Sequence, residues 1–202
     1  MRILVPAVLL AALALVAPTD IAPAWAQDAK ALAAQYCEGC HGEGGRGVSS
    51  FFPRLAGQQK AYMVARLKGM ADFSKIDAHV QYFMGRTAFK LTPADVQALA
   101  AYYAAAPAEH GAAEDPALVK RGDALYHDGI ASRSVVACAM CHGPDAAGSG
   151  KTPRLAGQYD SYLERQIGII KVGLARDKVA HANVSGLEAE DVQALAAYLA
   201  SR

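Results

Sequence analysis

The sequence feature that most constrains this chain is a five-residue pattern, C-x-x-C-H, that occurs twice. The copies start at Cys37 and Cys138, and together they use all four cysteines of the chain. Two thiols at this spacing form thioethers with the two vinyl groups of one porphyrin, and the histidine that follows coordinates the iron. The pattern therefore predicts two covalent haems. The attachment residues are Cys37, Cys40, Cys138 and Cys141, and the iron ligands are His41 and His142.

Pairs of cysteines spaced by two residues also occur in redox disulfides and in structural zinc sites. A thioredoxin-type pair has no need of the trailing histidine, and nothing in this sequence resembles its βαβ context. A zinc site needs two pairs that converge, whereas each pair here carries its own sequence surroundings. Haem attachment is therefore the favoured interpretation.

The first 26 residues have the pattern of a secretory signal peptide. Arg2 supplies the positive start, 3–17 is an apolar run, and 24–26 is an A-x-A cleavage site. The run is shorter than the ~20 residues of a spanning helix, and prolines flank or interrupt it, which argues against a membrane anchor. We therefore expect cleavage before Gln27 and export to the periplasm, where c-type haem is attached.

The charge of the chain is nearly balanced, with 20 basic and 19 acidic residues. Four haem propionates would make the holoprotein mildly acidic. Nothing here suggests a nucleic-acid partner, since such proteins carry a basic excess. We expect at most peripheral association with a membrane.

An internal repeat divides the mature chain into two halves. The hexapeptide P-R-L-A-G-Q occurs at 53–58 and 153–158, and the octapeptide D-V-Q-A-L-A-A-Y at 95–102 and 191–198. A stretch with prolines, glycine and acidic residues, without an apolar period, separates the halves. The predicted division is a signal peptide at 1–26, a domain at 27–106, a linker at 107–117 and a second domain at 118–202.

The periodic segments of both halves are helical, and no alternating strand pattern appears. Thr92 is the expected N-cap of the last helix of the first half, with Pro93 at its first position. That helix places Val96, Leu99 and Tyr103 on one face. Further helices are expected at 29–36, 59–70, 117–126 and 159–172.

These features together resemble a dihaem cytochrome c of the cytochrome c4 family. The residues that carry the resemblance are the signal, the tandem C-x-x-C-H motifs, the repeated hexapeptide and the repeated octapeptide. The resemblance implies an all-α fold of two tandem class I cytochrome c domains, each wrapped around one covalent haem c. In that family the proline after the haem motif offers its carbonyl to the proximal histidine, a role that carries onto Pro53 and Pro153.

The family also supplies a methionine as the sixth iron ligand, just before the leucine that opens the last helix. In the first half this residue is Met84, seven residues before Leu91. Met63 and Met70 lie in the preceding helix, at a spacing better suited to packing. Ligation by His41 and Met84 favours Fe(II) and fills both axial positions, so such an iron exchanges electrons and does not bind substrate.

The second half departs from this pattern. Ala180 stands seven residues before Leu187, and no methionine follows Met140. His181 is one residue from the expected position and is the favoured sixth ligand of the second iron. Lys178 and an open or water-bound iron are the alternatives.

The resemblance implies a periplasmic carrier of single electrons and not an enzyme. Its partners would be redox proteins: a dehydrogenase or quinol-oxidising complex as donor, and a terminal oxidase or reductase as acceptor. The alternative is a haem enzyme, or the cytochrome subunit of a periplasmic dehydrogenase. In that case the weakly or openly ligated second haem would act on a small substrate.

Overall fold

The computed structural model describes residues 24–72, 80–111, 115–173 and 182–202. These residues form helices and irregular segments, with two isolated β-bridges and no strand among them. The predicted all-α fold is therefore confirmed. No helix in the described ranges is long and apolar enough to cross a membrane. The predicted signal peptide lies outside them except for its last three residues, which begin the first helix.

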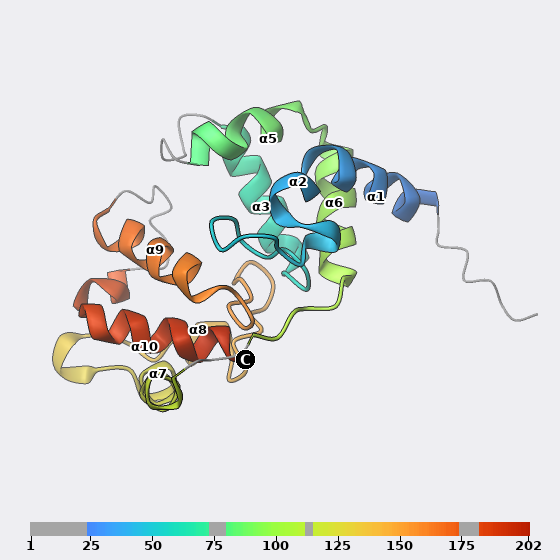
Figure 1. Ribbon diagram of the computed structural model, residues 1–202. Coiled ribbons are helices and arrows are strands. Elements are labelled where there is room, and N and C mark those ends of the chain that lie inside the picture. The colour runs from blue at the N-terminus through green and yellow to red at the C-terminus, as the bar shows by residue number, and fades with distance from the viewer. Residues whose placement is uncertain (1–23, 73–79, 112–114, 174–181) are drawn as a thin grey trace, which may run out of the picture.

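The helices form two groups, one for each half of the repeat (Figure 1). The first domain contains α1 (Ala24–Tyr36), α2 (Glu38–His41), η1 (Glu43–Gly45), α3 (Lys60–Ala71), η2 (Gln81–Gly85), α5 (Arg86–Lys90) and α6 (Pro93–Ala105). The second domain contains α7 (Pro116–Asp128), η3 (Ala131–Arg133), α8 (Ala139–His142), α9 (Asp160–Lys171), η4 (Ala182–Gly186) and α10 (Ala189–Ala200). In each domain the first long helix packs against the last, α1 against α6 and α7 against α10.

Helix α6 begins where the sequence predicted. The Thr92 hydroxyl accepts from the Asp95 N–H at 3.2 Å, and the Asp95 carboxylate accepts from the Thr92 N–H at 2.8 Å. These two bonds form a capping box, which satisfies backbone donors that have no partner inside the helix. The face predicted to be buried is buried, with Val96, Leu99 and Tyr103 each at most 4% exposed.

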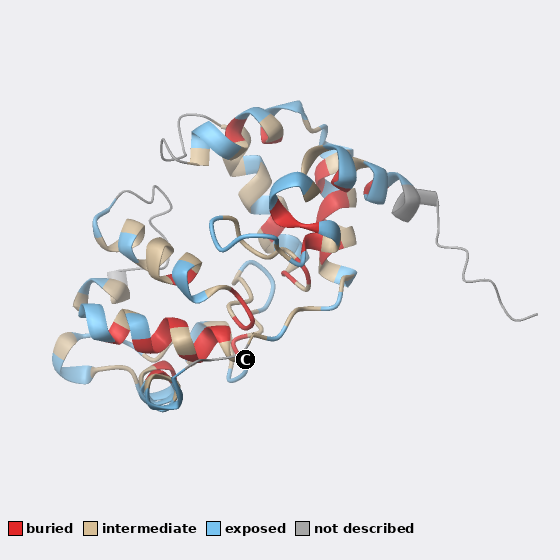
Figure 2. Cartoon of the chain, viewed as in Figure 1, coloured by how far each residue is buried: buried red, intermediate tan, exposed pale blue. Residues whose placement is uncertain are grey.

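Each domain has its own hydrophobic core, and Figure 2 shows buried residues concentrated on α10 and within the first group of helices. The first core contains Ala33, Met63, Leu99, Ala100 and Tyr103. Met63 is 6% exposed, in accord with the packing role that its spacing suggested. The second core, built largely from α7, α9 and α10, is centred on Tyr126, Leu163, Leu195, Tyr198 and Leu199.

The segment between the two domains packs against both of them. A Cβ added to Gly57 would lie 2.5 Å from the Ala108 Cβ, and one added to Gly157 would overlap the Glu109 carbonyl oxygen. Glu109 also pairs with Arg46 at 3.4 Å. The segment therefore packs closely against the repeated hexapeptide of each domain.

Helix α7 begins at Pro116, inside the range predicted for the linker. Asp115 is the reason, because its carboxylate accepts from the N–H groups of Ala117 and Leu118 at 2.8 and 3.3 Å. Proline suits the first helical position, because an N–H at that position would have no partner within the helix. We propose that the first domain spans 27–106 and that the second begins with α7, two residues before the predicted limit of 118.

The contact between α7 and α10 is closest at Gly122. A Cβ there would overlap the carbonyl oxygen of Ala194 and lie 2.6 Å from the Tyr198 Cβ. One turn further on, the fully buried Tyr126 ring lies 5.3 Å from the Tyr198 ring. Glycine at this position therefore sets the distance between the two helices.

Replacing Gly122 with alanine is expected to lower the free energy of unfolding of the second domain by about 2 kcal/mol. Overpacking that must move backbone costs up to about 3 kcal/mol, and the higher helix propensity of alanine offsets about 1 kcal/mol of it. Gly168 in α9 is the matched control, because a Cβ there meets nothing within 4 Å. Denaturant unfolding of the holoprotein should show Gly168→Ala unchanged or slightly stabilised, and equal effects of both substitutions would contradict close packing at Gly122.

Candidate haem sites and the contact between them

Each C-x-x-C-H motif folds into a single helical turn. The N–H of His41 donates to the Cys37 carbonyl, and the N–H of His142 donates to the Cys138 carbonyl, both at 2.9 Å. Residues three and four positions apart lie on the same face of a helix. The two thiols and the imidazole of each motif are therefore presented on one side, as attachment to one porphyrin requires.

The four thiols are free, with no disulfide among them. The first cysteine of each motif is half-buried and the second is exposed. Burial raises the pKa of the Cys37 and Cys138 thiols, which disfavours the thiolate needed by a redox pair or a zinc site. No group of three or more His, Cys, Asp or Glu side chains in the described ranges is placed to hold a metal ion. The reduced, spatially paired thiols of each motif are compatible with thioether attachment to a haem.

The imidazole of each motif is oriented by the proline that the sequence analysis singled out. Nδ1 of His41 lies 2.8 Å from the Pro53 carbonyl oxygen, and Nδ1 of His142 lies 3.0 Å from that of Pro153. A carbonyl only accepts, so Nδ1 carries the proton and the lone pair of each ring lies on Nε2. This tautomer makes Nε2 the nitrogen that can bind iron.

His41 has the surroundings of an iron ligand. Its side chain is 4% exposed, and its buried Nε2 has no hydrogen-bond partner among the described residues. A buried polar atom without a partner is costly, and a metal bond at this nitrogen removes that cost. Burial lowers the pKa of His41, and the bond to Pro53 opposes this only in part. The ring therefore stays neutral, which is the form that binds a metal.

Glycines turn the chain directly after each motif. Gly42 and Gly143 have φ angles of 78° and 79°, and a Cβ on Gly42 would lie 2.8 Å from the Gly47 backbone. The turn allows the carbonyl of His41 to accept from the Gly47 N–H at 2.7 Å, with the equivalent bond at 2.9 Å in the second domain. This path returns the chain to the proline that holds the imidazole.

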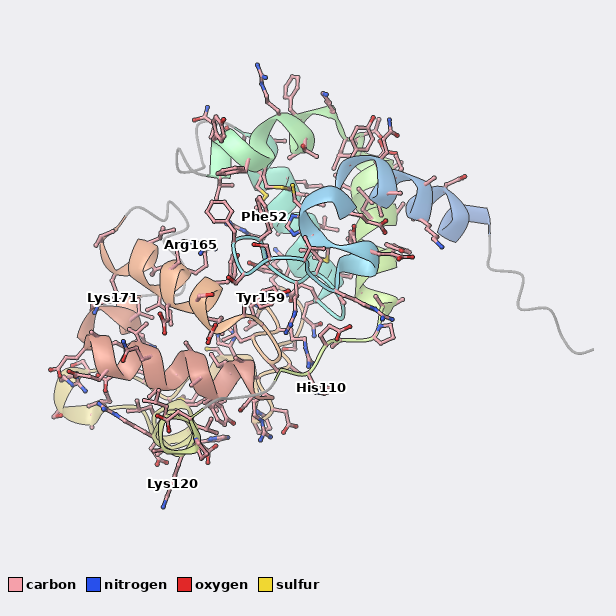
Figure 3. All side chains as sticks on the ribbon, viewed as in Figure 1. Phe52, His110, Lys120, Tyr159, Arg165 and Lys171 are labelled. Atoms are coloured by element: carbon pink, nitrogen blue, oxygen red, sulfur yellow. The ribbon has the colours of Figure 1, made fainter. Side chains whose placement is uncertain are left out.

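Met84 lies in η2, a π-helical turn that continues directly into α5, and its side chain is half-buried. The neighbouring Phe83 ring packs on Phe52 (labelled in Figure 3) with the ring centroids 5.7 Å apart. The Phe52 ring in turn lies 6.0 Å from the His41 ring. These contacts bring the turn to the part of the first domain that contains His41. Isolated π turns recur at functional sites, which supports Met84 as the sixth ligand that the sequence predicts.

The predicted sixth ligand of the second iron, His181, lies outside the described residues. The alternative ligand Lys178 lies outside them as well, and the description resumes at η4. This part of the site therefore stays a sequence-based prediction.

The two repeated hexapeptides contact each other across the domain boundary. Gln58 accepts from the Arg154 N–H at 2.8 Å and donates to the Arg154 carbonyl at 3.0 Å. Gln158 accepts from the Arg54 N–H at 2.9 Å and donates to the Arg54 carbonyl at 3.1 Å. Both glutamines are buried. Sequence reasoning singled out the hexapeptide as a repeat but gave no role to its glutamine.

Two arginines extend this contact. The Arg54 guanidinium donates to the Gly157 carbonyl at 2.6 Å and lies 4.0 Å above the Tyr159 ring. Arg165 donates to the Phe51 carbonyl at 2.6 Å and lies 5.1 Å from the Phe51 ring (Figure 3). The loops that carry the two proximal prolines are therefore held against each other.

Two helical domains, each with a C-x-x-C-H turn and an oriented imidazole, define a dihaem c-type cytochrome. The sequence profile of the family described as Cytochrome c matches the chain twice, at residues 26–105 and 119–202. The chain belongs to the cytochrome c family, within its dihaem cytochrome c4 group, and its two domains carry two covalently bound haem c groups.

Individual relatives agree with this assignment. Cytochrome c4 from Thiocapsa roseopersicina is 40% identical over 145 residues, covering 70% of this chain and 72% of the relative. A thiosulfate dehydrogenase electron acceptor from Thiomonas intermedia is 38% identical over 148 residues, covering 68% of this chain and 63% of that protein. The cytochrome c4 structure from Acidithiobacillus ferrooxidans superposes with a TM-score of 0.78 at 33% identity, covering 83% of this chain and 99% of that one.

Proposed function

We propose that this dihaem electron carrier works in the periplasm and passes single electrons between two protein partners. Each haem supplies a one-electron Fe(III)/Fe(II) couple when bound. The observation that carries the proposal is the His41 site, where the proximal ring is 4% exposed and fixed by the Pro53 carbonyl. A fixed proximal ligand helps to keep the ligand geometry the same in both oxidation states, and Met84 as sixth ligand would exclude substrate from the first iron.

We assign the residues of the first site as follows. Cys37 and Cys40 would hold the haem, His41 would bind its iron through Nε2, and Met84 would be the sixth ligand. The Pro53 carbonyl orients His41 by accepting a hydrogen bond from Nδ1 at 2.8 Å. In the second site the corresponding residues are Cys138, Cys141, His142 and Pro153, with His181 as the proposed sixth ligand.

The proposed electron donor is a periplasmic dehydrogenase or a quinol-oxidising complex, and the proposed acceptor is a terminal oxidase or reductase. The relative named as the electron acceptor of a thiosulfate dehydrogenase supports a dehydrogenase as donor. The periplasmic location rests on the signal-peptide pattern at 1–26. The mature protein isolated from its own cells should begin at Gln27.

The function is tested by mixing the purified holoprotein with each class of partner in a stopped-flow spectrometer. A reduced dehydrogenase should reduce both haems rapidly, and an oxidised terminal oxidase should reoxidise them. The protein alone should show no steady turnover of thiosulfate, peroxide or nitrite. Steady turnover that disappears in His181→Ala would overturn the carrier role and support the enzyme.

A second candidate function, a haem enzyme, is favoured by one observation: no methionine follows Met140, so the second iron lacks the thioether ligand of the family. If His181 is the ligand instead, His181→Ala should convert the second iron from low spin to high spin. It should also let that iron bind carbon monoxide when reduced, while the first haem stays as it was. A histidine donates more strongly than a thioether and stabilises Fe(III), so the wild-type second haem should have the lower potential.

Low-temperature EPR of the oxidised protein and carbon monoxide titration of the reduced protein measure these effects. His110→Ala is the matched control, because His110 is an exposed histidine in the segment between the domains (Figure 3). Ready binding of carbon monoxide by the wild-type second haem, or an unchanged spin state in His181→Ala, would reject His181 as ligand. Ready binding of carbon monoxide would favour the open site, and an iron that stays low spin in His181→Ala would favour Lys178.

A further inference from the structure

One peptide group in each domain is hydrogen-bonded at both of its ends. The Pro53 carbonyl accepts from His41 at 2.8 Å, and the N–H of the same peptide, which belongs to Arg54, donates to Gln158 Oε1 at 2.9 Å. Each end of this peptide therefore reaches a different domain. A single amide separates the proximal imidazole of the first domain from a side chain of the second.

The second domain has the same arrangement in the opposite direction. The Pro153 carbonyl lies 3.0 Å from Nδ1 of His142, and the Arg154 N–H donates to Gln58 Oε1 at 2.8 Å. The two connections are therefore reciprocal. Each proximal histidine is linked through one peptide to a glutamine of the other domain.

The orientation of each glutamine amide follows from its neighbours. Gln58 Oε1 also accepts from the Gln59 N–H at 2.8 Å, and Gln158 Oε1 also accepts from the Tyr159 N–H at 3.1 Å. The reversed amide would place an NH₂ group against two N–H donors, which cannot bond to it. Both side chains are at most 8% exposed, so water competes little for these bonds.

A hydrogen bond donated by a peptide N–H polarises the carbonyl of the same peptide. Cooperative strengthening of this kind is about 10–30% per bond. A stronger carbonyl acceptor draws the Nδ1 proton of the histidine and makes Nε2 a better donor to the iron. A more basic imidazole stabilises Fe(III), so an acceptor at the far end of the peptide lowers the reduction potential of that haem.

We propose that Gln58 and Gln158 are crossed positioning residues, each of which sets the donor strength of the proximal histidine in the other domain. Gln158 acts on His41 through the Pro53–Arg54 peptide, and Gln58 acts on His142 through the Pro153–Arg154 peptide. The inference goes beyond the proposed transfer of electrons between partners, and it rests on His41 and His142 as iron ligands. It makes the reduction potential of each haem depend on contact with the neighbouring domain.

The test is Gln158→Leu in the full holoprotein, because this substitution removes all three hydrogen bonds of the side-chain amide without changing the charge. In a redox titration, the wave of the first haem should move to higher potential. This wave is identified by its response to Met84→Ala. The wave of the second haem should stay in place. Gln58→Leu should give the reverse pattern, raising only the second wave.

A second readout is independent of electron transfer. In the reduced protein, the NMR resonance of the His41 Nδ1 proton should move upfield in Gln158→Leu, as expected for a weaker hydrogen bond to Pro53. Gln158→Met gives the same test with an unbranched side chain, should leucine disturb the domain contact.

Gln59 provides the matched control. Its Nε2 donates across the same boundary to the carbonyls of Ala147 at 2.9 Å and Gly148 at 3.3 Å, so its side-chain bonds in the described residues go to neither proximal peptide. Gln59→Leu should leave both potentials unchanged. A shift confined to the haem of the substituted domain, or equal shifts in Gln59→Leu, would overturn the proposal. If His41 or His142 were not an iron ligand, the NMR spectrum of the wild-type protein would already show this in the resonances of that imidazole. That result is therefore distinct from a failure of the glutamine proposal.

Discussion

Met84→Ala is expected to abolish the thioether-to-iron charge-transfer band of the oxidised protein and to lower the potential of the first haem by on the order of 0.1 V. A thioether is soft and uncharged and favours Fe(II), and axial ligands shift haem potentials over a range of about 0.8 V. The expectation rests on the half-buried position of Met84 in η2 and on the contacts from Phe83 through Phe52 to His41. Absorption spectra and a redox titration measure both effects.

Met63→Leu is the matched control for this experiment. Met63 is 6% exposed in the core of the first domain, and a methionine-to-leucine exchange there costs less than about 1.5 kcal/mol. The band should survive in Met63→Leu. If the band survives in Met84→Ala and disappears in Met63→Leu, the ligand comes from α3 and the family pattern does not hold for this chain.

Asp191→Ala is expected to lower the free energy of unfolding of the second domain by about 3 kcal/mol. The Asp191 side chain is 0% exposed and accepts from Arg121 at 2.7 Å, from Arg133 at 2.6 Å and from the Glu188 N–H at 2.9 Å. Removing one partner of a buried ion pair typically costs about 3–5 kcal/mol. The lower end of this range applies here, because the side chains of Arg121 and Arg133 are 47% and 28% exposed and water can solvate them once the carboxylate is removed.

Asp95→Ala is the control, because Asp95 occupies the same position of the identical octapeptide in the first domain. In the part of the chain that the structure describes, its side chain forms the capping box with Thr92, so its loss should cost about 1 kcal/mol. Denaturant unfolding of the holoprotein, followed separately at each domain, gives the two values. Equal costs at the two positions would show that the arginine bonds contribute nothing to stability.

The Asp191 effect should also depend on pH. Burial raises the pKa of Asp191, but the bonds from Glu188, Arg121 and Arg133 outweigh burial and hold it below its ordinary value. Because the folded pKa is depressed, the stabilisation is complete above the ordinary value of about 3.9 and is lost as the pH falls through the lower folded pKa. Wild type and Asp191→Ala should therefore differ fully at neutral pH and converge below about pH 4. A difference that persists in acid would contradict an ionic origin.

Local rules explain what could be predicted from the sequence. A C-x-x-C-H motif is recognised from five consecutive residues, and the start of α6 follows from Thr92 and Pro93 alone. Both features could therefore be predicted without tertiary information. The buried face of α6 follows in the same way from a period of 3.6 residues.

Partners that are distant in the chain explain what could not be predicted. Asp95 and Asp191 stand in identical octapeptides, yet among the described residues it is Asp191 that pairs with two arginines. Arg121 and Arg133 come from the helices that precede it in the second domain. Similarly, Gln58 hydrogen-bonds to the backbone of Arg154 in the other half, and Gln158 to that of Arg54. The repeat indicates that these positions matter, but only the fold shows which copy contacts which residue.

The meeting of two identical hexapeptides has a consequence for the origin of the molecule. A surface that binds its own copy through reciprocal contacts is isologous, which is the geometry of a two-fold homodimer. A single ancestral half with this hexapeptide would already have carried both sides of the contact. Duplication and fusion would then have converted a pairing that depended on protein concentration into a permanent one, with the segment packed over Gly57 and Gly157 as its tether.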